Sequence, residues 1–117
     1  MQYLLMCCFD EARWEGIAES ERAAIMRDYA AWVERTVRSG QHLATGRLQP
    51  TAAARTIRMR NGKAVVTDGP FAETKEQLGG YHLLECKDLD EAIAIAGRIP
   101  TLDAGGVIEV RPLERAL

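Results

Sequence analysis

The sequence predicts an α+β fold built from two strand–helix–strand units with a β-hairpin between them. Three observations support this prediction: an apolar strand at the start of the chain, two segments whose apolar residues recur at helical spacing, and an Asn-Gly dipeptide between two alternating segments. At 117 residues the chain is long enough for one core and too short for two. We therefore expect residues 1–117 to form a single domain.

The first unit consists of a strand, a long helix and a second strand. Residues 2–9 are apolar on both alternating faces, which predicts a strand that is central in its sheet. Ser20 is expected to cap a helix that runs to about Ser39, where Gly40 stops it. Residues 42–48 then predict the second strand. The apolar residues of the helix are Met26, Tyr29, Ala30, Val33 and Val37.

A hairpin follows the first unit. Residues 56–60 and 63–67 flank an Asn-Gly dipeptide, which is the strongest short signal for a two-residue turn between strands. The resulting register separates two sides of the hairpin. The apolar side carries Ile57, Met59, Ala64 and Val66, and the cationic side carries Arg58, Arg60 and Lys63.

The second unit repeats the strand–helix–strand order. Residues 79–86 predict a strand, and Asp88 is expected to cap a short helix that runs through Arg98. Residues 107–113 predict the last strand. Two such units with right-handed crossovers combine into a ferredoxin-like antiparallel sheet with both helices on one face. Because the other face is also apolar, we expect a homodimer that packs through this open sheet face.

Composition and charge argue against several functions. With 15 Lys and Arg against 17 Asp and Glu, the chain lacks the basic surface that phosphates require, so we expect no direct binding of nucleic acid. Its longest apolar run, residues 3–9, is too short to cross a bilayer and follows no basic leader, so we predict a cytoplasmic protein without a membrane partner. The cysteines form no CxxC pair and no glycine-rich phosphate loop is present, so we expect neither a metal nor a cofactor.

Three segments carry a resemblance to a known family. These are DGPFAETKEQLGG at residues 68–80, ECKDLDEAIAIAGRIP at residues 85–100 and IEVRPL at residues 108–113. In these segments the chain resembles the YCII-related family, in particular its DGPF subgroup. The resemblance implies a dimeric α/β barrel. Most such proteins have no established activity, some are encoded beside extracytoplasmic-function sigma factors, and a related one is a small lyase that removes chloride from a hydroxylated aromatic ring.

Tyr29 and His82 are two candidate catalytic residues. The resemblance implies that Tyr29 occupies the position of a histidine proposed as catalytic in shorter family members. A phenol is a poorer base than imidazole at neutral pH, but it can donate a hydrogen bond or a proton. Alternatively, Tyr29 is an amphipathic residue of the core. His82 becomes a general base if its sheet face lines a cavity, although a lone histidine on a strand is usually structural.

The third catalytic candidate is Asp68, at the end of the hairpin. A carboxylate beside a Gly-Pro turn can project into a cleft, or it can serve only as the cap of an Asx-turn. Pro70, Phe71, Glu73 and Lys75 follow and are expected to bind substrate, with a solvated loop as the alternative.

Two hypotheses of function remain open. The first is a cofactor-independent lyase or isomerase that acts on a small polar or aromatic molecule, the ligand lying beside the loop at residues 68–77. The second is a non-catalytic dimer that binds a ligand or contacts a transcription regulator such as a sigma factor.

Overall fold

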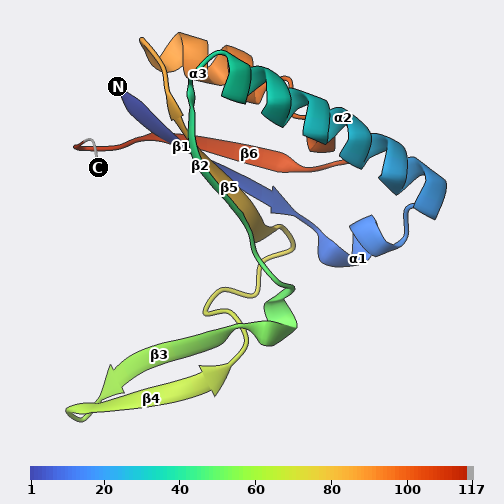
Figure 1. Cartoon of the computed structure of the whole chain (residues 1–117). Helices are drawn as coiled ribbons and strands as arrows, with labels where there is room; N and C mark the ends of the chain where they lie inside the picture. The colour runs from blue at the N-terminus through green and yellow to red at the C-terminus, as the bar shows by residue number, and fades with distance from the viewer. Residues whose placement is uncertain (116–117) are drawn as a thin grey trace.

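The structure, a computed structural model, describes residues 1–115 and contains six strands and three α-helices in that range (Figure 1). Two short 3-10 turns, η1 at Thr51–Ala53 and η2 at Pro100–Leu102, complete the secondary structure of these residues. The order is β1 at Gln2–Phe9, α1 at Glu11–Glu15, α2 at Glu19–Arg38, β2 at His42–Arg47, β3 at Arg55–Arg60, β4 at Lys63–Asp68, β5 at Gln77–Glu85, α3 at Leu89–Ala96 and β6 at Val107–Pro112.

Four strands form the main sheet in the order β2-β5-β1-β6, and every neighbouring pair is antiparallel. This is the ferredoxin-like order, so the predicted α+β fold class with an antiparallel ferredoxin-like sheet is confirmed. The central position predicted for the first strand is also correct, because β1 lies between β5 and β6. Leu5 on β1 lies opposite His82 on β5 and Val110 on β6.

The core lies between the main sheet and the two long helices, α2 and α3, which both cover one face of the sheet. Trp32 joins these layers, since its indole nitrogen donates a 2.9 Å hydrogen bond to the Ile95 carbonyl of α3. The fully buried side chains of greatest volume are Trp32, Leu5, Leu84 and Ile99. None of the helices among residues 1–115 is long and apolar enough to span a bilayer.

Helix α2 differs from its prediction in start and orientation. It begins at Glu19 after Ala18, which makes no side-chain capping hydrogen bond, so Ser20 is not the cap. Trp32 and Thr36 are its buried residues, whereas Val37, expected in the core, is 56% exposed. The large indole of Trp32 fills the space against the sheet and sets the helix face that turns inward.

The sequence reading missed α1 and placed the end of α3 too late. Asp10 caps α1, because its carboxylate accepts hydrogen bonds from the backbone nitrogens of Ala12 at 3.1 Å and Arg13 at 3.2 Å. In α3 the predicted cap is confirmed, with Asp88 accepting from the Glu91 nitrogen at 2.9 Å. This helix ends at Ala96 before Gly97, not at Arg98.

Strand β5 carries a bulge at Gly79, where the register against β1 shifts by one residue. A Cβ atom at Gly79 would lie 2.0 Å from the Phe9 ring, so only glycine leaves room for that ring. Gly80 meets a similar limit, since its Cβ would lie 2.9 Å from the Gly46 carbonyl oxygen. The Gly79-Gly80 pair is therefore explained by close packing.

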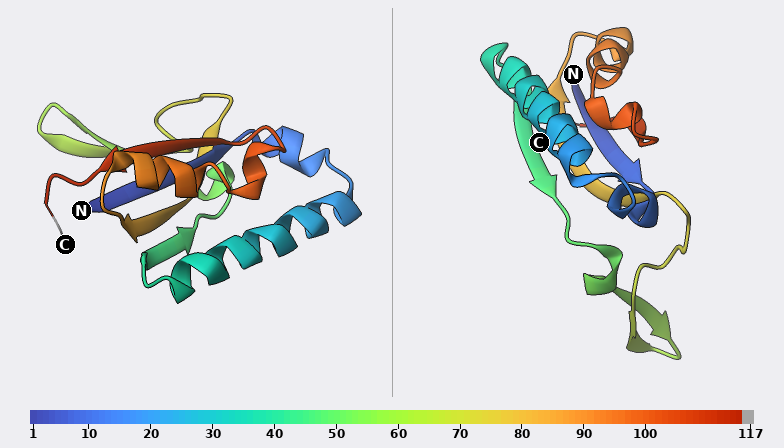
Figure 2. Two further views of the ribbon diagram at one scale, coloured as in Figure 1. Left: turned by 90° about the horizontal axis from the view of Figure 1, so that it is seen from above. Right: turned by 90° about the vertical axis from the view of Figure 1, so that its right-hand side faces the viewer.

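The hairpin has the predicted register, with Arg60 opposite Lys63 and Ile57 opposite Val66. Asn61 and Gly62 have φ values of 53° and 78°, as a two-residue turn of this kind requires. β3 and β4 form their own two-stranded sheet, separate from the main sheet. Figure 1 and the view from above in Figure 2 place this hairpin on the side of the main sheet away from α2.

Leu5→Ala tests the core. Leu5 is fully buried, and its truncation is expected to lower the free energy of unfolding by about 2–5 kcal/mol, through lost burial and the cavity left behind. Urea unfolding followed by circular dichroism measures this change. Leu43→Ala is the matched control, because Leu43 is 47% exposed and should cost less than about 1 kcal/mol. Equal effects of the two variants would contradict this core.

Candidate functional site

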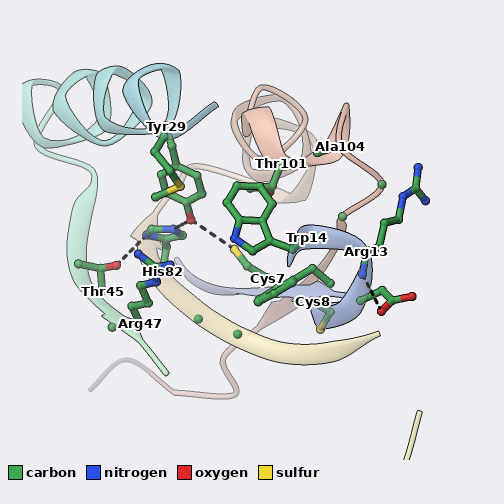
Figure 3. A pocket seen from close by; sticks show the side chains of 18 of the residues that line it. Cys7, Cys8, Arg13, Trp14, Tyr29, Thr45, Arg47, His82, Thr101 and Ala104 are labelled. Carbon is green, nitrogen blue, oxygen red and sulfur yellow. Dashed lines mark hydrogen bonds between the residues drawn. The ribbon is translucent and has the colours of Figure 1, made fainter. Parts of the chain in front are cut away.

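A cavity of about 180 Å³ lies between α2 and the helix-covered face of the main sheet, beside α1 (Figure 3). Most of its wall is apolar, formed by Phe9, Trp14, Met26 and Val33 together with glycines of β5 and of the segment before β6. One part of the wall is polar and is built from side chains of three strands and α2. These polar residues are Cys7, Tyr29, Thr45, Arg47 and His82, and Asp10, Arg13 and Thr101 line the cavity away from them (Figure 3).

Tyr29 and His82 form the centre of the polar wall. α2 presents Tyr29 one turn before Trp32, and β5 presents His82 on the helix-covered face. The Tyr29 hydroxyl is hydrogen-bonded to Nε2 of His82. The Cys7 sulfur lies 3.6 Å from the same hydroxyl, so one phenol contacts both a thiol and an imidazole. Figure 3 shows these three side chains meeting at one end of the cavity.

The other ring nitrogen of His82 faces β2. Nδ1 of His82 lies 3.0 Å from the Thr45 hydroxyl and 3.1 Å from Nε2 of His42. The Thr45 hydroxyl donates a hydrogen bond to the Tyr81 carbonyl at 3.1 Å. Its oxygen can therefore accept a hydrogen bond from Nδ1–H of His82. We assign the proton of neutral His82 to Nδ1 on this basis. Nε2 then accepts from the Tyr29 hydroxyl.

Burial moves the pKa values of this cluster away from neutrality. The pKa of His82 is lowered from 6.5 to about 4, first by burial and then by the neighbouring His42, whose own pKa burial also lowers. The pKa of Tyr29 is raised, again mainly by burial and further by Cys7. Burial raises the pKa of Cys7 as well. At pH 7 the cluster therefore consists of a neutral imidazole, a neutral phenol and a thiol.

Arg47 adds a positive charge to this neutral wall. It is the last residue of β2 and lines the cavity beside Tyr29. Its charge acts to lower the pKa of Tyr29, against the larger effect of burial. Within residues 1–115 Arg47 takes part in no ion pair. It is therefore available to an anionic or ionisable group on a ligand.

The structure brings together Tyr29 and His82 and keeps Asp68 apart from them. Asp68 ends β4 on the projecting hairpin, where its side chain is 92% exposed. Its carboxylate lies 3.2 Å from the Arg55 guanidinium and forms a cross-strand ion pair instead of an Asx-turn cap. Within the described part of one chain, Asp68 does not line the cavity.

The other expected binding residues, Pro70, Phe71, Glu73 and Lys75, also lie outside this cavity in the described chain. Phe71 is 78% exposed, and the side chains of Glu73 and Lys75 face solvent. The loop is held by the Gln77 side chain, whose amide nitrogen donates to the carbonyls of Ala72 at 3.0 Å and Thr74 at 2.7 Å. In a single copy of the chain the loop is therefore held by its own hydrogen bonds.

Several site residues were missed or undervalued from the sequence. Cys7, His42, Thr45 and Arg47 were not among the residues predicted for the site. The bulge in β2 between His42 and Ala44 hid the signal, because it changes which residues of β2 share a face. No group of His, Cys, Asp and Glu within residues 1–115 has the arrangement of a metal site.

The chain belongs to the YCII-related family. The model of the YCII-related domain matches residues 1–116, nearly the whole sequence. The chain is also 41% identical over 114 residues to the uncharacterized protein R00369 of Rhizobium meliloti strain 1021, covering 97% of this chain and 92% of that protein.

A solved structure shares the fold at low sequence identity. It is the 5-chloro-2-hydroxyhydroquinone dehydrochlorinase TftG of Burkholderia phenoliruptrix AC1100 in complex with 2,5-dihydroxybenzoquinone. The similarity has a TM-score of 0.58 at 15% identity and covers 99% of this chain and 96% of that one. At this identity the likeness extends to the fold alone.

The lowered pKa of His82 predicts how stability depends on pH. The unfolded chain binds a proton at His82 near pH 6.5, whereas the folded chain binds it only near pH 4. The contribution of His82 to the free energy of unfolding is therefore highest above pH 6.5 and is lost as the pH falls from 6.5 through about 4. Urea unfolding at intervals between pH 7.5 and 4 measures this slope. His82→Gln should make the slope shallower and leave the contribution of His42. An unchanged slope in this variant would contradict a buried neutral His82.

Proposed function

We propose that this protein binds a small hydroxylated aromatic molecule in the cavity beneath α2 and transfers a proton from it, as a cofactor-independent lyase or isomerase. The observation that carries the proposal is the Tyr29–His82 hydrogen bond at one end of a mostly apolar cavity. Apolar walls suit a flat ring, and a few convergent polar groups suit its substituents. A volume of about 180 Å³ agrees with one such ring.

The Tyr29–His82 pair supports a proton relay. A ligand hydroxyl that approaches the Tyr29 oxygen passes its proton to that oxygen, while Tyr29 passes its own proton to Nε2 of His82. The products of this step are an anionic ligand and a His82 imidazolium. The imidazolium can return this proton through Tyr29 to a ring carbon, which gives a keto isomer. Loss of a second hydroxyl proton together with a leaving group on that carbon then gives a quinone, so the first step is an isomerase reaction and the two together are a lyase reaction. The structural neighbour, which shares the fold, is a dehydrochlorinase bound to a dihydroxybenzoquinone, and hydroxylated quinones are therefore the first ligands to test.

The pKa of His82 limits the ligand further. With its pKa near 4, His82 is a weak base, and proton transfer to it is favourable only from an acidic hydroxyl, such as one on a quinone or another electron-poor ring. Arg47 would stabilise the resulting anion at the same wall. Arg47 is exposed at the mouth of the cavity, so solvent screens part of this attraction.

A second candidate function is non-catalytic binding of the same class of ligand. The observation that favours it is the separation of the two pKa values, since that of Tyr29 is raised and that of His82 is lowered. Because both pKa values lie far from pH 7, Tyr29 and His82 keep fixed protonation states as hydrogen-bonding groups, and fixed donors and acceptors suit ligand recognition. A measurement of turnover distinguishes the two functions, since only the lyase or isomerase converts its ligand to a product.

The functional unit in this proposal is a cytoplasmic homodimer. The main sheet carries apolar side chains on its open face, the face away from the helices, including Leu4, Met6 and Tyr81. A second copy packed on this face would cover them. The cysteines Cys7, Cys8 and Cys86 are free thiols, in agreement with a reducing compartment.

Arg47→Gln tests ligand binding. The wild-type protein is expected to bind 2,5-dihydroxybenzoquinone, and loss of the Arg47 charge should weaken binding about tenfold or more. Isothermal titration calorimetry at pH 7.5 measures the affinity. Arg98→Gln is the matched control, because Arg98 is exposed and lies outside the cavity. Equal affinities of the two variants would argue against an anion held by Arg47.

Tyr29→Phe and His82→Gln test the relay. If the protein is a lyase, both variants should lower kcat by about 10²–10⁴-fold while binding falls much less. Chloride release from 5-chloro-2-hydroxyhydroquinone is a suitable first assay. Asp68→Asn should leave turnover unchanged, since its carboxylate lies in solvent on the hairpin. Wild-type binding without turnover on a panel of hydroxylated rings would favour the non-catalytic function.

A further inference from the structure

The hairpin arm, which we define as residues 55–68, packs against little else in its own chain. β3 and β4 pair with each other, and within the described chain neither makes an extensive contact with another helix or strand. The arm nevertheless has regular hydrogen-bonded structure. Its base is closed by a 2.8 Å hydrogen bond from the Gly69 nitrogen to the Ala54 carbonyl and by the ion pair between Arg55 and Asp68.

One side of the arm leaves large apolar side chains in solvent. Ile57, Met59 and Val66 are 68%, 70% and 59% exposed, and the register of the hairpin puts all three on the same side. An isolated two-stranded hairpin is marginally stable in water. An ordered arm with this composition is therefore expected to bury its apolar side against another surface.

The dimensions of the chain also indicate a missing partner. Its radius of gyration is 16.1 Å, whereas a compact domain of this length has a value of about 13 Å. The excess comes from the projecting arm seen in Figures 1 and 2. A six-residue hairpin is about 20 Å long, and four strands spaced about 4.8 Å apart span about 14 Å. The arm is thus long enough to cross a sheet of the size of the main sheet.

Charge favours a second copy of this chain as the partner that covers the arm. The arm carries four cations and one carboxylate, a net charge of +3. Because the whole chain has a net charge of −2, the remainder carries −5. The arm of one copy is therefore attracted to the body of another. The arm and the open face of the main sheet also lie on the same side, away from α2, so one partner can cover both.

We propose that the arm is a dimer clasp, which lays its apolar side on the open-face side of a second copy and receives that copy's arm in return. Such an exchange is reciprocal, as a two-fold interface requires. The cationic side, with Arg58, Arg60 and Lys63, then faces away from the covered surface, and its charges attract the acidic body of the partner at longer range. The inference extends the homodimer of the proposed function and is independent of the ligand and its chemistry.

The test is the association of the full chain, measured by sedimentation velocity over a range of concentrations. Ile57→Asp combined with Met59→Asp should raise the dimer dissociation constant at least tenfold. Both side chains are exposed in a single copy, so the variant should keep its circular dichroism spectrum and its affinity for 2,5-dihydroxybenzoquinone. Ile93→Asp is the matched control, since Ile93 is 52% exposed on α3, and it should leave association unchanged.

Each outcome decides the proposal. Weaker association of the arm variant alone supports the clasp, and so does a dissociation constant that rises with added salt. An unchanged dissociation constant overturns the clasp and leaves the dimer, whereas a monomeric wild type overturns both. A third outcome is that the protein binds a 20-nucleotide RNA or DNA and that Arg58→Ser/Arg60→Ser abolishes this binding. If association of the Ile57/Met59 variant is also unchanged, the arm is a nucleic-acid surface and the clasp is overturned. Ligand binding is read separately in every case.

Discussion

The packing of Trp32 is the interaction on which both the fold and the candidate site depend. Its indole is 1% exposed and is hydrogen-bonded to α3, while its ring centroid lies 4.8 Å from that of His82 and 6.0 Å from that of Tyr29. One side chain thus fixes the distance between the two helices and covers the imidazole. Burial of His82 follows from this contact, and the shifted pKa follows from the burial.

The same burial gives the site its chemical character. In a low-polarity environment an uncharged imidazole and phenol are the stable forms, so at this end of the cavity the charge comes from Arg47. A ligand that ionises supplies the missing negative charge and finds a cation beside it. Selectivity in this arrangement comes from the acidity of the ligand as well as from its shape, since a neutral ring without an acidic group leaves Arg47 unpaired.

Local signals in the sequence were sufficient for the topology. The two-sided apolar strand at residues 2–9, the Asn-Gly turn and the Asp88 cap are each determined by nearby residues, and they fixed the strand order, the hairpin register and one helix start. The site depends on which distant residues meet, and here the prediction was incomplete. Tyr29 and His82 are 53 positions apart. A strand bulge and the inward rotation of Trp32 set their neighbours, and neither leaves a periodic pattern.

The cavity draws none of its lining residues from positions 48–78, and the chain is outside the main sheet between Arg47 and Gln77. The hairpin and its loop are therefore an insertion between two adjacent strand ends. Apart from Thr51, whose nitrogen donates to the Glu11 carboxylate of α1, such a segment can lengthen, shorten or change sequence during divergence without changing the residues that line the cavity. In relatives of this chain, changes in the hairpin and its loop can therefore alter how two copies assemble while the residues that line the cavity stay the same. The assembly surface and the site can evolve at different rates in one small domain.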